Sequence, residues 1–94
     1  MDIDDVIWRD EIILKLARKQ AVSPEEVIEV FASEPSFQRA EKGERPGEDV
    51  YVAFGRSAAG RYLTVFFIYK KDRRALIVSA RQMTQRVRQR YERK

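Results

Sequence analysis

Apolar residues recur along the chain with two different periods, and the change between them separates a helical part from an extended part. In residues 9–19 the apolar positions return at helical spacing, which predicts an amphipathic helix. A second helix is predicted to begin at Ser23, because Ser23 and Glu26 match a capping box with Pro24 in the first turn. Two short helices are therefore expected before residue 35.

From residue 36 the pattern becomes that of β-strands. Residues 37–41 predict an edge strand, and residues 50–54 alternate between apolar and less buried positions. Residues 62–69 are apolar on both faces apart from one threonine, which predicts the central strand of a sheet. Residues 75–79 predict a last strand. The short connections between these strands indicate antiparallel hairpins.

The chain is predicted to close with a basic amphipathic helix over residues 81–91. Its apolar positions at helical spacing are Ala80, Met83, Thr84, Val87 and Tyr91. With a brief strand at residues 6–8, the elements predict an α+β fold. We expect one domain, residues 1–94, in which two N-terminal helices and the basic C-terminal helix accompany an antiparallel sheet of about four to five strands.

Composition narrows the chemistry that such a domain offers. The 94 residues include no Cys and no His, so thiolate zinc sites, thiol nucleophiles and histidine bases are excluded. We expect neither a metal nor a cofactor. No apolar run is long enough to cross a bilayer, and the acidic start is unlike a signal peptide, so we expect a cytoplasmic protein.

Positive charge is concentrated at one end of the chain. The last 25 residues hold ten Lys or Arg against two acids, a net charge of +8, whereas the whole chain carries +4. Such a surface attracts the phosphate backbone of RNA or DNA, and it equally suits an acidic protein partner. The alternative is that these charges serve only solubility. The candidate nucleic-acid-binding residues are Arg56, Arg73, Arg74, Arg86, Arg88 and Tyr91.

Five segments match, in order, the sequence pattern of a known family. They are residues 18–26 (RKQAVSPEE), 47–56 (GEDVYVAFGR), 59–63 (AGRYL), 76–84 (LIVSARQMT) and 90–92 (RYE). By these segments the chain resembles the BrnT family, small ribonuclease toxins of type II toxin–antitoxin systems with a RelE-like fold. The Ser-Ala-Arg-x-x-Thr segment is fairly specific, whereas the glycine positions alone are not.

The resemblance implies a toxin that cleaves RNA, inhibits translation and is neutralised by a cognate antitoxin encoded next to it. It also allows for a higher-order toxin–antitoxin complex. By resemblance Arg81, Lys71, Arg56 and Tyr91 match the family pattern. The chain departs from that pattern at Gln20 (His in many relatives), Val50 (Arg), Lys70-Lys71 (an acidic–Arg pair) and Val87 (Glu).

RNA cleavage without a metal requires that the ribose 2′-hydroxyl be oriented and that charge on the attacked phosphate be stabilised. Arg81 directly follows the last predicted strand, so we expect its side chain to point across the sheet and to stabilise that phosphate. Lys70 or Lys71 is expected opposite Arg81 across the hairpin. Glu48 and Lys70 are the candidate general bases. The alternative function is a non-catalytic nucleic-acid-binding or regulatory module that uses the basic C-terminal helix.

Overall fold

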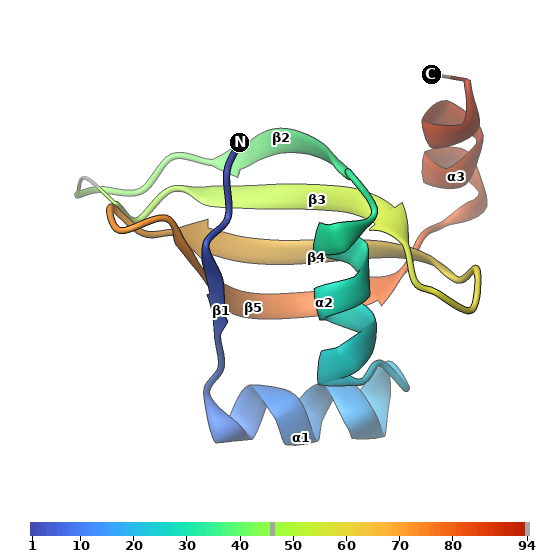
Figure 1. Ribbon diagram of the computed structural model, residues 1–94, viewed down its shortest axis with the longest axis horizontal. Helices are drawn as coiled ribbons and strands as arrows, with labels where there is room; N and C mark the ends of the chain where they lie inside the picture. Colours follow the sequence, from blue (N-terminus) through green and yellow to red (C-terminus); the bar gives the residue numbers. More distant parts are fainter. Residues whose placement is uncertain (46, 94) are drawn as a thin grey trace.

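The computed structural model describes residues 1–45 and 47–93 and has the predicted α+β fold. In chain order the elements are β1 (Asp5–Ile7), α1 (Asp10–Lys19), α2 (Pro24–Ala32), β2 (Ser36–Glu41), β3 (Val50–Arg56), β4 (Tyr62–Tyr69), β5 (Arg74–Gln82) and α3 (Gln85–Glu92). No helix among the described residues has the length and apolar character needed to cross a membrane. Figure 1 shows the strands as one twisted layer.

The five strands lie in the order β1-β5-β4-β3-β2, so β4 is central and β2 lies at an edge, as predicted. Strands β2 to β5 pair antiparallel with their sequence neighbours. The sheet as a whole is mixed, because β1 pairs parallel with β5, with Asp5 opposite Arg74. The expectation of a purely antiparallel sheet was wrong at this edge, where the pairing strands are not joined by a hairpin.

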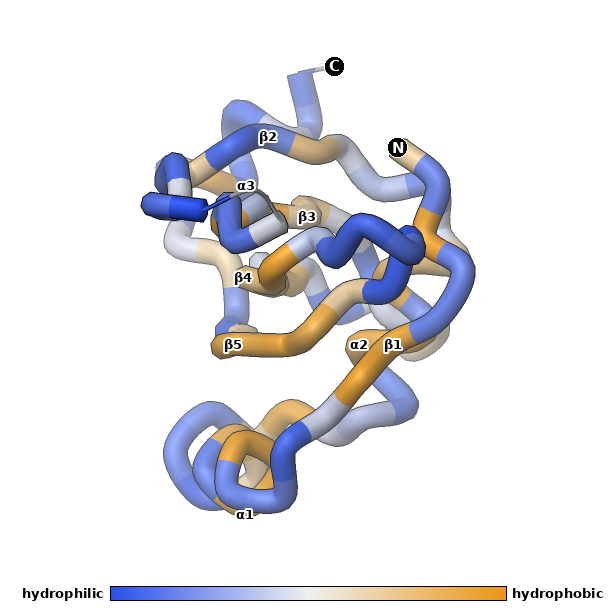
Figure 2. Tube along the Cα trace, turned by 90° about the vertical axis from the view of Figure 1, so that its left-hand side faces the viewer, coloured by the Kyte–Doolittle hydropathy of each residue, from blue (hydrophilic) through white to orange (hydrophobic). Residues whose placement is uncertain are grey.

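Helix α2 lies across one face of the sheet, and α1 runs below the sheet along the edge at β5 (Figure 1). Alternate residues of the strands, among them Leu63, Val65 and Phe67 of β4, are fully buried against Leu16 of α1 and Val27 of α2. Figure 2 shows how apolar and polar residues are separated, with apolar strands at the centre and polar positions on the outer side of α1. Hydrophobic burial between these two layers therefore forms the core.

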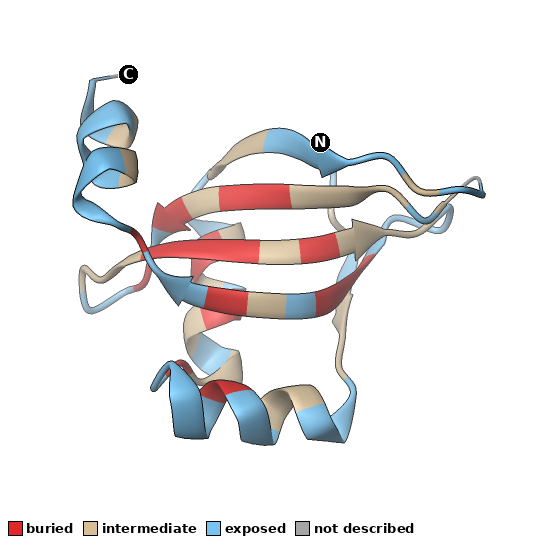
Figure 3. Ribbon diagram, turned by 180° about the vertical axis from the view of Figure 1, so that it is seen from behind, coloured by how far each residue is buried: buried red, intermediate tan, exposed pale blue. Residues whose placement is uncertain are grey.

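On the opposite face of the sheet, onto which Figure 3 looks, none of the described residues forms a helix across the middle. Successive side chains of a strand point to opposite faces, so the neighbours of the core residues point here. We call this surface the open face and define it by Gln38, Phe54, Tyr62, Phe66 and Arg81. Helix α3 stands at one end of the open face (Figure 3).

The predicted capping box at the start of α2 is present. The Ser23 hydroxyl accepts a hydrogen bond from the Glu26 amide at 3.2 Å, and the Glu26 carboxylate accepts one from the Ser23 amide at 3.1 Å. The same carboxylate pairs with Arg61 at 2.8 Å. Since Arg61 also donates to the carbonyl of Ala21 at 2.8 Å, the β3–β4 loop is tied to the junction of α1 and α2.

The boundary between β5 and α3 differs from the prediction. Strand β5 continues to Gln82, and α3 begins only at Gln85, after the Thr84 hydroxyl accepts a hydrogen bond from the Val87 amide at 3.2 Å. Arg81 therefore lies in a strand, and Ala80, assigned to the helix stripe, is fully buried in the sheet core. The helix prediction over residues 81–91 was wrong in its first four residues.

Candidate nucleic-acid interface

Tyr62, the first residue of β4, is the centre of a group of arginine and tyrosine side chains. The guanidinium carbon of Arg56 lies 4.6 Å from the centre of its ring, and that of Arg88 lies 4.0 Å from it. Tyr91 of α3 meets the same ring edge to face at 5.9 Å. Sheet register places Arg56 opposite Tyr62, so β3, β4 and α3 all contribute to this group. We call Arg56, Tyr62, Arg88 and Tyr91 the arginine–tyrosine cluster.

Arg81 lies on the open face beside this cluster. It is exposed, it pairs in register with Thr64 of β4, and its guanidinium carbon lies 5.0 Å from the centre of the Phe66 ring. Its side chain thus lies over a ring of the sheet but remains exposed to solvent, and its role at a phosphate stays a prediction. Tyr62 is a diagonal neighbour of Arg81 in the ladder, a separation of roughly 7–8 Å between strands. One phosphodiester chain is therefore able to touch both.

Most of the positive charge at this end of the sheet has no acidic partner. Within residues 1–45 and 47–93, no ion pair shorter than 4.0 Å involves Arg56, Arg81 or Arg86. Arg88 does pair with Glu92, at 2.7 Å, and this hydrogen bond raises the pKa of the Arg88 guanidinium despite a smaller opposing effect of desolvation. Unpaired guanidinium groups over aromatic rings suit phosphate and base contacts.

The other predicted basic residues lie at the far end of the sheet. Glu48, Lys70 and Lys71 come together at the β4–β5 turn, where they line a shallow cavity of about 370 Å³ with Arg74. Strand β4 separates this turn from the arginine–tyrosine cluster by roughly 25 Å at the usual rise of a strand. The expectation that Lys70 or Lys71 lies opposite Arg81 across the hairpin was wrong.

Much of the basic charge at the turn is already paired with acids. Arg73 lies 3.5 Å from Asp4, and Arg74 lies 2.6 Å from Asp72. Desolvation alone would raise the pKa of the Asp72 carboxyl, but the hydrogen bonds from Arg74 outweigh it and leave the pKa below its ordinary value. The predicted binding residues Arg73 and Arg74 are thus less available to an anion than Arg56 or Arg81.

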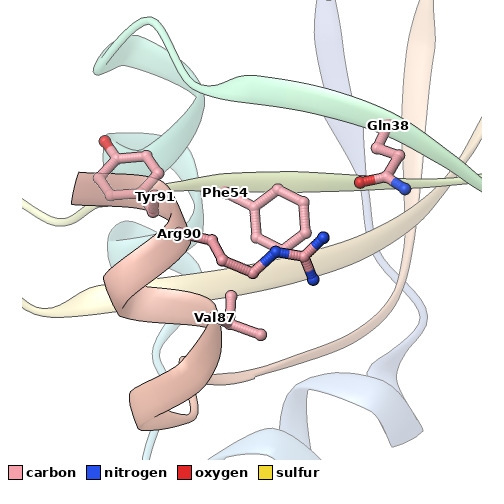
Figure 4. A pocket seen from close by; sticks show the side chains of 5 residues that line it. All are labelled: Gln38, Phe54, Val87, Arg90 and Tyr91. Atoms are coloured by element: carbon pink, nitrogen blue, oxygen red, sulfur yellow. The ribbon is translucent and has the colours of Figure 1, made fainter. Parts of the chain in front are cut away.

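A small cavity opens between α3 and the open face. Its volume is about 130 Å³, and it is lined by Gln38, Phe54, Val87, Arg90 and Tyr91. Figure 4 shows the Arg90 side chain extending from α3 past Phe54 toward Gln38. We call this cavity the α3 pocket. Tyr91 belongs to both the pocket and the arginine–tyrosine cluster, so the two adjoin.

Sequence reasoning did not select Phe54, Phe66 or Gln38 as site residues. A signal for the two aromatic residues was present, because strand alternation places Phe54, Tyr62 and Phe66 on one side and the core residues on the other. No comparable signal marks Gln38, whose position depends on the pairing of an edge strand. Among the described residues, no group of three or more Asp or Glu is arranged to hold a metal ion.

The sequence was also compared with models of known protein families and with curated proteins. Residues 8–86 match the model of the ribonuclease toxin BrnT of type II toxin–antitoxin systems. The chain belongs to the BrnT family. The match runs from the residue after β1 into the first turn of α3 and covers most of the chain, which confirms the resemblance seen in the sequence. No curated protein matches it significantly.

The BrnT match covers all of the basic β4–β5 turn but only part of the arginine–tyrosine cluster. It includes Arg56, Arg81 and the turn at Lys70-Lys71, but it ends before Arg88 and Tyr91. Three of the five residues that line the α3 pocket also lie beyond it. The membership therefore supports a toxin of this family, while the properties of α3 rest on the geometry of this chain.

Proposed function

We propose that this BrnT-family chain is an endoribonuclease toxin that acts on RNA along the open face, as a single domain. The observation that supports this site is the set of three arginine–aromatic contacts made by Arg56, Arg81 and Arg88. Arginine binds phosphate through a planar fork of donors, and aromatic rings stack on unpaired bases. Both kinds of contact with single-stranded RNA are available on one surface.

The reaction proposed is internal transfer of the phosphodiester. The 2′-hydroxyl passes its proton to water and attacks the adjacent phosphorus, and the bond to the 5′-oxygen breaks as that oxygen takes up a proton from water. The products are a 2′,3′-cyclic phosphate and a 5′-hydroxyl. Arg81 stabilises the charge that develops on the phosphorane, and Arg56 and Arg88 hold the neighbouring backbone. We propose that arginines do this work, because Arg56, Arg81 and Arg88 are the charged side chains that the structure gathers over the aromatic rings of this surface.

Glu48 and Lys70, the candidate general bases, do not act as bases in this proposal. A phosphate held by Arg81 lies too far from the β4–β5 turn for either residue to act on it as a base. We propose instead that Lys70 and Lys71 contact the RNA backbone further along the strand. A cognate antitoxin covering the open face would neutralise the toxin, which we place in the cytoplasm, where it would inhibit translation.

The test is cleavage of RNA, free and ribosome-bound, by the purified protein. Arg81→Ala should lower the cleavage rate by about a hundredfold, the scale of losing one charge-stabilising donor, with an unchanged melting temperature. Arg81→Lys should restore part of the rate, since charge is kept and the fork is lost. Arg18→Ala, on the exposed side of α1, removes the same charge away from the open face and should leave the rate unchanged. Absence of cleavage by the wild-type protein would end the enzyme proposal.

A non-catalytic RNA-binding module is the second candidate, and the distance of Glu48 and Lys70 from Arg81 favours it. In that case the protein binds RNA with an affinity that falls steeply with salt, and Arg86→Ala with Arg88→Ala flattens the dependence, yet no cleavage occurs. An affinity that does not change between about 50 and 200 mM salt would contradict both candidates, because each requires phosphate contacts.

A further inference from the structure

We propose that the α3 pocket is a subsite for one RNA base, with a preference for guanine. The inference rests on the proposed action on RNA and adds the residues that select the sequence. It is carried by the five side chains that surround the cavity, which combine an aromatic surface with hydrogen-bonding groups. A single-stranded base is recognised by this combination of stacking and edge contacts.

The apolar part of the pocket suits the face of a base rather than a bare phosphate. Phe54 is half-buried in the sheet and offers its ring to the cavity, while Val87 and Tyr91 supply apolar surface from α3. The volume of about 130 Å³ admits one ring system and not a folded peptide segment. Stacking on Phe54 would hold any base, so this contact gives affinity without selecting a sequence.

Selection comes from Arg90 and Gln38. Arg90 is exposed, has no ion pair shorter than 4.0 Å within the described part of the chain, and reaches past Phe54 toward Gln38 (Figure 4). A guanidinium only donates hydrogen bonds, and guanine presents two adjacent acceptors, N7 and O6, whereas adenine presents one acceptor beside a donor. The Gln38 amide oxygen is available to accept from the N–H groups of guanine.

The position of the pocket fits the path of an RNA strand. Tyr91 lines the pocket and packs on Tyr62 at 5.9 Å, and Tyr62 in turn lies under Arg56 and Arg88. A nucleotide with its base in the pocket therefore has its phosphate near the guanidinium groups of Arg56, which has no ion pair among the described residues, and of Arg88. The base next to the cleaved bond is the one that this geometry reads.

The experiment is a titration of the isotope-labelled full chain with the four nucleoside monophosphates, followed by NMR. GMP should shift the side-chain signals of Gln38 and Arg90 and bind about tenfold more tightly than AMP, the scale of one bidentate base contact. Ribose 5-phosphate, which lacks a base, should not shift the Gln38 signal. Equal affinities for GMP and ribose 5-phosphate, or no GMP-induced shift at Gln38 and Arg90, would overturn the proposal.

Variants separate the pocket from general charge effects. Arg90→Ala and Phe54→Leu should each weaken GMP binding by about tenfold, through loss of the base contact and of stacking. Arg39→Ala is the matched control. It removes an arginine adjacent in sequence to Gln38 whose side chain lies on the other face of β2, and it should leave GMP binding unchanged. A loss in the control equal to that in Arg90→Ala would refute the assignment.

The titration needs no RNA cleavage, so the two proposals fail separately. GMP binding at the pocket without cleavage would defeat the proposed function alone. Cleavage with no preference among bases, unaltered in Arg90→Ala, would defeat the subsite alone.

Discussion

The ion pair between Arg61 and Glu26 provides a quantitative test of what holds the two layers together. Two oxygens of Glu26 accept from the same Arg61 nitrogen, Nη1, at 2.8 and 3.0 Å. The two side chains are only 31% and 19% exposed. Hydrogen bonds to charged groups contribute about 1.5–3 kcal/mol when shielded, whereas exposed pairs contribute about 0.2–1 kcal/mol. With both side chains more than two-thirds shielded, we expect a coupling of about 1.5 kcal/mol.

The perturbation is a double-mutant cycle of Glu26→Gln and Arg61→Gln, measured by urea denaturation. The glutamine at position 26 keeps an oxygen able to accept from the Ser23 amide, so the cap is retained while the charge is lost. Glu26→Gln alone should lower the free energy of unfolding by about 1.5 kcal/mol, which corresponds in a thermal melt to a melting temperature lower by about 6–12 °C for a domain of this size. The single tryptophan, Trp8, packs against the core and reports unfolding by fluorescence.

The pair formed by Arg88 and Glu92 is the control for burial. Its separation, 2.7 Å, is the shorter one, but its side chains are 53% and 48% exposed. We expect a clearly weaker coupling there, because solvent screens exposed pairs one helical turn apart. If the two cycles gave equal couplings, or if the surface pair were the stronger, the argument from shielding would be refuted.

Two further substitutions test the backbone. Gly55→Ala would place a methyl group 3.0 Å from a methyl of Val30, so we expect a loss of about 1–3 kcal/mol in urea denaturation. A neutral result would mean that α2 shifts freely on the sheet. Ala21 follows the C-cap of α1 with a φ of 52°, a conformation that costs a side chain about 1–2 kcal/mol. Ala21→Gly should therefore raise the free energy of unfolding by about 0.5–1 kcal/mol after the entropy cost of glycine, and a decrease would contradict this assignment of strain.

Sequence periodicity identified every helix and strand, because most elements present one clear apolar face. It placed β4 at the centre from its two-sided apolarity and located the cap of α2 from three residues. It misjudged the end of β5 for a physical reason. Ala80 and Met83 are both buried although β5 continues to Gln82. These two apolar residues are three apart, which imitates helical spacing.

The sequence was enough to predict that the candidate site is basic, but not which of its residues lie close together in the fold. The basic helix and Arg81 were found from composition and position in the chain. Lys70 and Arg81 are separated by almost the full length of β5. The predicted strand ended at residue 79, which made this distance look shorter than it is. The pocket escaped prediction because Gln38 and Arg90 meet only through the packing of α3 beside β2 and β3.

The parallel pairing of β1 with β5 has a consequence for the order of folding. Strands β2 to β5 form a meander of short connections, which closes few residues at each step. Strand β1 pairs with residues about 70 positions later, so it closes a loop that contains both helices and the rest of the sheet. We expect the meander to form first and β1 to dock last, together with the start of α1. Amide protons of β1 should then exchange with solvent well before those of β4, and equal protection would contradict this order. Strand β1, although it precedes the meander in this sequence, is thus expected to pair last.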